Sequence, residues 1–585
     1  MSGGNEARPP AWLARGRAGR DLLLLVVVGL VLFGAGLGQR DPWPADEPRF
    51  ALIARDMAAT GEWFFPRVGG DLYQDKPPVF FWTIGSIYRL TGDLQVSFLL
   101  PSLLAGIGTL LLVYDLGRRV WSREAGLAGA LLLACSVQFV LQARAAQIDM
   151  LLTFFTTAAL YGIGRHLLLG PDWRAYALGG AAAGIGVITK GTGFLPLLLP
   201  LVFAGLRRTG LAGFAPGAGG ARWALAPAAA LAAIGAWLVP MVALVALSGD
   251  PELAAYRDEI LFRQTVTRYV AAWGHQEPWY YFVVNVIPGL WLPGTALLPW
   301  LVPGWRRALR AGDGRPLLFL GWALLVVVFF SASSGKRGVY VLPALPAFAL
   351  AAAPLLPALL ARAGVQRLLF GLGAALAAIA AGAWAWLSWL RPGALAELGS
   401  RYGVSSPAPL LAIALAVAAL LVLLRPRRGA LAWAASLAVL ALVQGYWIAP
   451  MLDATRSGRA FMAGVEARVP ATEELGLVDY REQYLLHARR PLTNFGHRRY
   501  LDGDQELFDA AAWLVAAPGR VLMVSRRGRD RCFAGAAATP LGEANRLEWF
   551  LVRGPADPGC AARGDLGAAR RYVPPVLPVA AQRLK

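Results

Sequence analysis

The sequence predicts an all-α polytopic membrane protein that ends in a small extracytoplasmic domain of α/β or α+β type. The chain of 585 residues is 57% hydrophobic and only 16% charged, whereas charged residues make up about a quarter of an ordinary soluble protein. Apolar runs long enough to cross a bilayer, roughly 20 residues each, recur over residues 21–448. Residues 449–585 are more polar and contain short runs such as RVLMVS and LEWFLVRG between turns, a pattern typical of strands.

About thirteen transmembrane helices are expected from the length and continuity of the apolar runs. Their approximate bounds are 21–38, 94–114, 125–143, 149–169, 175–190, 192–206, 223–247, 280–304, 316–332, 339–360, 366–390, 407–424 and 429–448. The sequence TKGTGF interrupts the fifth and sixth of these runs.

The distribution of arginine predicts the orientation of the helices. Gaps such as GRRVWSRE, WRRALRAGDGR and RPRRG are short and rich in arginine, which is typical of cytoplasmic loops. The basic N-terminal flank, residues 1–20, has no clear cleavage site and is expected in the cytoplasm. The longer gaps at 39–93, 248–279 and 391–406, together with the C-terminal domain, then lie outside. The formal charge of +20 therefore indicates topology and not nucleic-acid binding.

The first external loop starts with the sequence DEPRFALIARDM. Phe50, Ile53 and Met57 recur at helical spacing, which predicts an amphipathic helix that lies in the headgroup plane with its charged residues on the other side. Asp46 has two interpretations. It caps this helix, with Pro48 in the first turn, or it is a functional carboxylate just outside the bilayer.

Further along the same loop, the sequence GGDLYQDKPPVFFW places Asp75 and Lys76 before two prolines that prevent a helix from starting earlier. The aromatic residues that follow are expected at headgroup level. Lys76 is suited to bind a phosphate. The alternative is that its side chain only reaches toward the membrane surface and attracts anionic lipid.

Other ionisable groups lie at the outer ends of later spans. The sequence QARAAQIDML places Arg144 and Asp149 at the membrane edge, where such groups are usually functional, although a structural ion pair between the two is the alternative. The second large external loop contributes Arg268 and His275. Lys336, in SASSGKRGVYVLPALP, belongs to an external gap that is basic against the usual trend, which suggests a bound anion.

Together these groups predict one cavity at the outer membrane surface that binds phosphate and carries carboxylates for base or metal chemistry. Its carboxylates are Asp46, Glu47, Asp75 and Asp149, and its cations include Lys76, Arg144, Arg268, Lys336 and Arg337. The chain contains no Walker A, HExxH or nucleophile-elbow sequence. The energy for a reaction must therefore come with the substrate, as it does with an activated phosphate ester embedded in the membrane.

In order and spacing, the stretches DEPRFALIARDM, GGDLYQDKPPVFFW, ARAAQID, GVITKGTG and SSGKRGVYVLPALPAFAL resemble the polyprenyl-phosphate-dependent GT-C glycosyltransferases. Within that group the chain is most similar to the 4-amino-4-deoxy-L-arabinose lipid A transferases, in the clan of the protein O-mannosyltransferases. The resemblance covers residues 20 to about 350 well and the tail only loosely. It implies a multi-pass enzyme of the bacterial inner membrane, with its active site and C-terminal domain in the periplasm.

The resemblance also implies roles for individual residues. Asp46 matches the catalytic aspartate and Asp149 a second acidic position. The residues that hold the donor phosphate are expected to be Lys76, Arg268 and Lys336, and those that line the cavity Glu47, Arg49, Tyr73, Arg144 and Tyr340. Asp75 and His275 match a divalent metal site, with zinc as the expected ion. Two departures, Asp75 for a glutamate and Thr265 for a histidine, leave the metal and the identity of the sugar open.

The expected partners are an undecaprenyl phosphate-linked sugar donor, lipid A or another envelope acceptor, and the surrounding membrane lipids, with no nucleic acid. The expected chemistry is transfer with inversion at the anomeric carbon. One alternative is a transferase that uses mannose, galacturonate or a hexosamine, with a lipid or a protein as acceptor. A lipid or solute transporter is the other, although such proteins usually show inverted repeats and charges near the bilayer midplane. Whether Cys532 and Cys560 form a disulfide is open, because two cysteines alone do not establish it.

Overall fold

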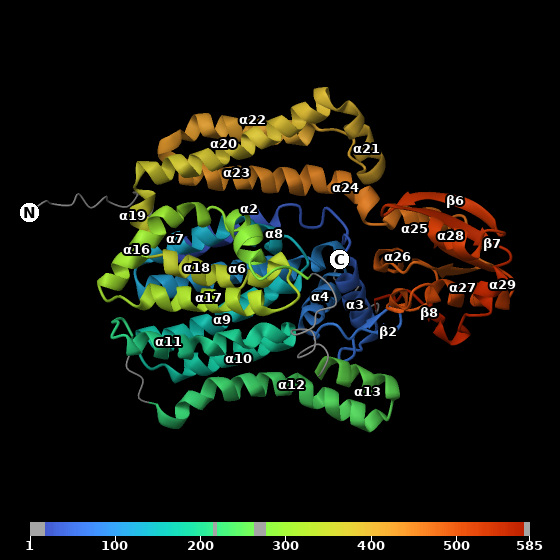
Figure 1. Cartoon of the computed structure of the whole chain (residues 1–585), viewed down its shortest axis with the longest axis horizontal. Coiled ribbons are helices and arrows are strands. Elements are labelled where there is room, and N and C mark those ends of the chain that lie inside the picture. The colour runs from blue at the N-terminus through green and yellow to red at the C-terminus, as the bar shows by residue number, and fades with distance from the viewer. Residues whose placement is uncertain (1–17, 215–218, 262–275, 578–585) are drawn as a thin grey trace, which may run out of the picture.

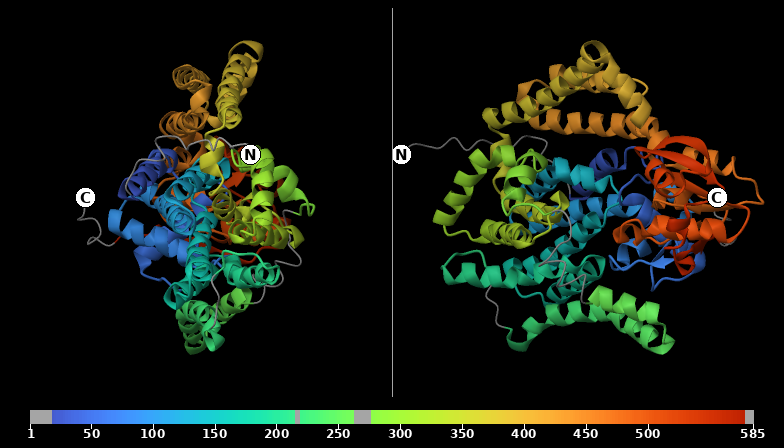
Figure 2. Two further views of the ribbon diagram at one scale, coloured as in Figure 1. Left: turned by 90° about the vertical axis from the view of Figure 1, so that its left-hand side faces the viewer. Right: turned by 45° about the vertical axis from the view of Figure 1, so that its right-hand side comes forward.

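The computed structural model describes residues 18–214, 219–261 and 276–577. Long helices lie side by side, and the strands of the C-terminal residues gather at one end of them (Figures 1 and 2). Figure 1 shows α3, α4 and β2 of the first external loop beside these strands, whereas α16 and α19 lie toward the opposite end. The expected external elements are therefore grouped at one end of the helical part.

The helical part has many elements, and their bounds follow in chain order. As far as α12 they are α2 Ala18–Gly34, α3 Glu47–Thr60, β1 Arg67–Val68, β2 Asp71–Leu72, α4 Val79–Thr91, α5 Leu94–Ser97, α6 Leu100–Val120, α7 Arg123–Ala134, α8 Val137–Ala143, α9 Ile148–Leu169, α10 Trp173–Thr189, η1 Gly191–Leu198, α11 Leu199–Arg208, η2 Gly220–Ala224 and α12 Leu225–Ser248. From α13 onward they are α13 Pro251–Asp258, η4 Phe282–Val286, α15 Ile287–Leu290, η5 Thr295–Leu297, α16 Leu298–Arg310, α17 Arg315–Ala332, η6 Gly338–Val341, α18 Ala344–Ala352, α19 Leu356–Leu360, α20 Ala363–Ala385, η7 Trp386–Leu390, α21 Pro392–Tyr402, α22 Ala408–Leu424, η8 Pro426–Arg428, α23 Gly429–Val443, η9 Gln444–Ile448 and α24 Ala449–Arg456.

The mostly helical fold of a multi-pass membrane protein is confirmed, but the number of spans is not. Within the described residues, five helices are long and apolar enough to cross a membrane, or up to seven if each of two bent pairs is one span. The pair α7 and α8 bends by 68°, and the pair formed by residues 282–290 and 295–310 bends by 93°. Apolar runs that look continuous in the sequence are thus broken into shorter helices, and the expected count of about thirteen stays a prediction.

The C-terminal unit, residues 459–572, is built around a six-stranded mixed sheet of order β6-β7-β5-β3-β4-β8. Strand β3 pairs in parallel with β4 and β5, and the outer pairs are antiparallel. Its elements are α25 Arg459–Glu466, β3 Glu474–Leu477, α26 Glu482–His487, β4 Leu492–Asn494, η10 Arg499–Asp502, α27 Gln505–Ala516, β5 Arg520–Ser525, α28 Arg526–Cys532, β6 Ala537–Ala544, β7 Leu547–Arg553, α29 Pro558–Ala561, η11 Leu566–Ala568 and β8 Arg570–Tyr572.

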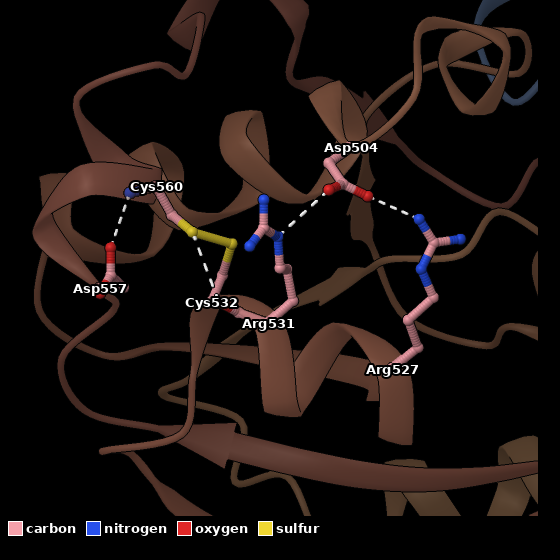
Figure 3. The surroundings of a disulfide bond; sticks show 6 residues. All are labelled: Asp504, Arg527, Arg531, Cys532, Asp557 and Cys560. Carbon is pink, nitrogen blue, oxygen red and sulfur yellow. Dashed lines mark hydrogen bonds and ion pairs between the residues drawn. A yellow bond between two sulfur atoms is a disulfide. The ribbon is translucent and has the colours of Figure 1, made fainter.

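A disulfide joins Cys532, at the end of α28, to Cys560 in α29 (Figure 3). Both cysteines are buried in a separate apolar core of the C-terminal unit, together with residues such as Phe495 and Trp513. The disulfide that the sequence left open is therefore present in the structure. On the neighbouring surface, Arg527 and Arg531 both pair with Asp504 (Figure 3).

The C-terminal unit covers the charged side of α3. The helix forms as expected, with Phe50, Ile53 and Met57 buried. Arg55 is buried as well, however, and donates a hydrogen bond of 2.7 Å to the carbonyl oxygen of Leu486. The charged side of the helix is therefore covered, because the C-terminal unit packs against it and supplies hydrogen-bond acceptors, while the position of the helix in the headgroup plane stays a prediction.

Candidate functional site

Asp46 lies directly before α3 and points toward the segment between α17 and η6. Its side chain makes no capping hydrogen bond to the helix, so the alternative that this carboxylate serves only as a cap is wrong. The Asp46 Oδ2 atom instead accepts a hydrogen bond of 3.0 Å from Nη2 of Arg337. Arg49, one turn into α3, approaches the same carboxylate with an N–O distance of 4.0 Å.

Asp149 occupies the first turn of α9 and forms an ion pair with Lys190. The distance between Lys190 Nζ and Asp149 Oδ1 is 2.6 Å. The same ammonium group lies 4.3 Å from the centre of the Tyr340 ring, within the range of a cation–π contact. An ion pair between Asp149 and Arg144 was the structural alternative, and it is wrong because Lys190 takes this position.

These two pairs belong to one group of charges, which we call the rim cluster: Asp46, Arg337, Asp149 and Lys190. The positive charge of Arg337 interacts with both Asp46 and Asp149, which places the second carboxylate near the first pair. Four segments that are distant in the sequence supply these side chains. Asp46 and Arg337 are the more exposed pair, and Asp149 is buried. Two carboxylates and two cations in this arrangement can bind a phosphate and act on a neighbouring hydroxyl group.

Lys190 was not among the site residues expected from the sequence. The available signal was the sequence TKGTGF, which interrupts an apolar run. In the structure α10 ends just before Lys190 and η1 starts just after it. A lysine at such a break in an apolar segment is costly unless it is paired, and here Asp149 is its partner.

Glu47, adjacent to Asp46, has a different environment. It is buried, and its two oxygen atoms accept four hydrogen bonds. Two of these come from the guanidinium group of Arg40, one from the backbone N–H of Trp43 at 3.0 Å and one from that of Ala146 at 3.0 Å. This carboxylate therefore holds the first loop against the start of α9, whereas the sequence had placed it in the cavity lining.

Three of the five residues expected at the donor phosphate or a metal lie in the described part of the chain, and all three have protein partners. Lys76 is partly buried, and its ammonium group donates to the carbonyl oxygen of Asp75 at 3.0 Å. The carboxylate of Asp75 pairs with Arg498 of the C-terminal unit. Lys336 is buried, and it donates to the carbonyl oxygens of Glu277 at 2.7 Å and Ser333 at 2.6 Å. Its neighbour Arg337, and not Lys336, contacts Asp46.

Two further residues expected in the cavity lining, Arg144 and Tyr73, lie in different parts of the structure. Arg144 donates to the carbonyl oxygens of Leu32 at 2.9 Å and Ala441 at 3.0 Å, so it ties α8 to α2 and α23. Tyr73 is buried with its ring edge-on to Phe81. Burial, and then the charge of Asp75, raises the pKa of the Tyr73 hydroxyl, so it stays protonated.

Arg268 and His275, and the departure at Thr265, lie outside the described residues. Within the described parts of the chain, no three His, Cys, Asp or Glu side chains come together in a way that could hold a metal ion. Asp75 is paired with Arg498, which is not the surrounding of a metal ligand. The described residues do not fit a zinc site by themselves, and the metal stays a prediction.

The family model of dolichyl-phosphate-mannose-protein mannosyltransferases matches residues 75–230. The crystal structure of ArnT from Cupriavidus metallidurans bound to undecaprenyl phosphate superimposes with a TM-score of 0.69 at 21% identity, covering 92% of this chain and 98% of that one. The chain has the GT-C fold.

Two curated relatives agree with this fold. The undecaprenyl phosphate-alpha-4-amino-4-deoxy-L-arabinose arabinosyl transferase of Pseudomonas aeruginosa is 31% identical over 367 residues, 60% of this chain and 61% of the relative. The protein of the same name from Edwardsiella ictaluri is 30% identical over 332 residues, 54% of this chain and 56% of the relative. The match thus covers less than two thirds of these relatives, and it confirms the resemblance to GT-C glycosyltransferases of this type.

Proposed function

We propose that the chain is an inverting glycosyltransferase that moves a sugar from undecaprenyl phosphate to lipid A or a related envelope acceptor. The observation that carries the proposal is the rim cluster, which stands at the first-loop end of a fold shared with ArnT. The curated relatives are named for 4-amino-4-deoxy-L-arabinose, which makes this the first sugar to test.

In the proposed reaction an oxygen of the acceptor attacks the anomeric carbon of the donor sugar. The bond between that carbon and the phosphate oxygen breaks, and undecaprenyl phosphate leaves with the electron pair. If the acceptor is a hydroxyl group, Asp46 takes its proton. If the acceptor is a phosphate, no proton has to be removed, and Asp46 stabilises the positive charge that develops on the sugar.

The cations have the complementary role of binding the leaving phosphate, which gains negative charge as the bond breaks. We assign this role to Lys76 and Arg268, with Lys336 as a third cation. Asp149, paired with Lys190 at 2.6 Å, sets the position of that ammonium group. Arg337 orients the Asp46 carboxylate through the 3.0 Å hydrogen bond.

The proposed location is the bacterial inner membrane, with about thirteen spans and the rim cluster facing the periplasm. The disulfide between Cys532 and Cys560 supports an extracytoplasmic C-terminal unit, because structural disulfides persist mainly in oxidising compartments. That unit packs on the first loop, so both lie on the same side of the membrane.

The test uses the purified full-length chain in detergent with undecaprenyl phosphate-linked 4-amino-4-deoxy-L-arabinose and lipid A. Mass spectrometry should show lipid A heavier by one sugar residue, together with released undecaprenyl phosphate. A second set of reactions offers donors that carry mannose, galacturonate or a hexosamine. If only one of these donors is used, the proposed sugar is wrong but the proposed transfer reaction stands. If no donor is used, the proposal is overturned.

A further inference from the structure

Glu482 connects the C-terminal unit to the rim cluster. It lies in the first turn of α26, and its Oε1 atom accepts a hydrogen bond of 2.6 Å from Nε of Arg49. Only 10% of the Glu482 side chain and 24% of the Arg49 side chain are exposed. Such a partly buried, charge-assisted contact restricts a long side chain more strongly than a surface ion pair does.

Arg49 is the residue through which Glu482 reaches Asp46. The Nε atom of Arg49 faces Glu482, whereas its Nη1 atom lies 4.0 Å from Oδ1 of Asp46. Because the guanidinium group is planar and rigid, fixing one edge of it also fixes the direction of the other. Burial lowers the pKa of Arg49, but the carboxylates of Glu482 and Asp46 more than offset this, so the pKa lies above its usual value.

Glu482 is itself held in place by its surroundings. Helix α26 packs against α3, and Arg55 of α3 donates to the backbone of the same helix at Leu486. His497 lies beside Glu482, with 3.7 Å between Nδ1 and Oε1. Burial, and then the charge of Arg49, lowers the pKa of His497, so it is neutral at pH 7 and does not compete with Arg49 for the carboxylate.

From this geometry we infer that Glu482 is a positioning residue of the transferase site. It fixes Arg49 so that the guanidinium group faces Oδ1 of Asp46, whereas Arg337 contacts Oδ2, and the C-terminal unit thereby completes the site. The inference rests on the proposed function, since it assigns Glu482 a part in sugar transfer.

The test compares E482A and E482Q with the control E474A in the full-length enzyme. Glu474 is on strand β3 of the same unit, but its side chain is exposed and forms a surface ion pair with Arg520 at 3.2 Å. E482A should lower kcat by about 100-fold, the scale expected when a site group moves by about 1 Å, with donor KM within about two-fold. E482Q keeps an oxygen that accepts from Nε of Arg49 and should recover activity to about 10-fold below wild type. E474A should match wild type.

Measuring E482A in the R49K variant distinguishes a positioning role of Glu482 from a general effect on the stability of the protein. If Glu482 acts through Arg49, the two changes will not be additive, and E482A should cost no more than about two-fold in R49K. Thermal unfolding in detergent gives the folded fraction of every variant. If E482A does not fold, E482Q decides: a loss of kcat at unchanged KM and unchanged unfolding midpoint supports the role.

Each remaining outcome has a definite consequence. If the wild type transfers sugar and E482A and E482Q are as active as E474A, the inference about Glu482 is overturned but the proposed function stands. Losses that follow only the folded fraction, or that add fully to R49K, also overturn it, because they describe a structural contact. A wild type that transfers no sugar overturns the proposed function and this inference with it.

Discussion

Two adjacent carboxylates at the start of α3 have opposite surroundings. Asp46 is partly exposed, makes no capping bond and meets one guanidinium group closely. Glu47 is buried, and four hydrogen bonds occupy both of its oxygens. A group with unused hydrogen-bonding capacity can act on a substrate, whereas a saturated one can only hold the fold. We therefore expect Asp46 and the rim cluster to take part in the reaction, and the network around Glu47 to hold the first loop in place.

The largest expected effect follows from D46N. The asparagine has the shape of aspartate but cannot accept a proton or provide a negative charge, so transfer should fall by about 10³-fold, within the range of general base catalysis. The unfolding midpoint should change little, because Asp46 makes no capping bond. The measurement is sugar transfer per folded molecule. Near-normal activity in D46N would remove Asp46 from the reaction.

E47A tests whether Glu47 has a structural role. Removing this carboxylate leaves Arg40 buried without its partner, and breaking a buried ion pair costs about 3–5 kcal/mol. Thermal unfolding in detergent should therefore show a clear loss of stability, and the molecules that remain folded should still transfer sugar. An E47A protein of normal stability that lacks activity would reverse the assignment of the two carboxylates.

K190M is expected to have an intermediate effect. Methionine keeps most of the apolar stem, but it removes the ammonium group that pairs with Asp149 at 2.6 Å and lies 4.3 Å from the centre of the Tyr340 ring. Transfer should fall by about 100-fold if Lys190 is part of the site that stabilises the leaving phosphate. K190R, which keeps the charge, is the matched control and should retain more activity. Equal activity in both variants would show that the charge is unnecessary.

The smallest expected effect is a loss of stability at acidic pH that arises from His487. His487 is buried 3.8 Å from Asp41, and burial lowers its pKa below the usual 6.5. The unfolded chain therefore binds this proton more readily, so stability is lost as the pH falls below 6.5. Between pH 8 and pH 5 the loss should be on the order of 1 kcal/mol, and H487N should reduce this slope. An unchanged slope in H487N would assign the pH dependence to other groups.

The sequence was sufficient for the features that are local. The helix after Asp46 and the helix that contains Asp149 in its first turn followed from the spacing and continuity of apolar residues. The GT-C resemblance came from short motifs, and the structure agrees with its fold.

The partners of these residues could not be predicted, because they come from distant parts of the chain. Asp149 was expected to pair with nearby Arg144, but the structure pairs it with Lys190. The cover on the charged side of α3 is a second example, because the C-terminal unit buries Arg55 and accepts its hydrogen bond. The span count is unconfirmed for another reason. A bend of 93° between two helices does not change the hydropathy of the apolar run that contains them, so the sequence cannot reveal it.

A structure of the full-length chain with undecaprenyl phosphate-linked sugar, determined by cryo-electron microscopy, would test the assignment of the rim cluster most directly. The lipid phosphate should lie against Lys76 at the end of the molecule that carries α3, with the anomeric carbon of the sugar facing Asp46. Density for the phosphate at the opposite end, near α16 and α19, would contradict the proposed site.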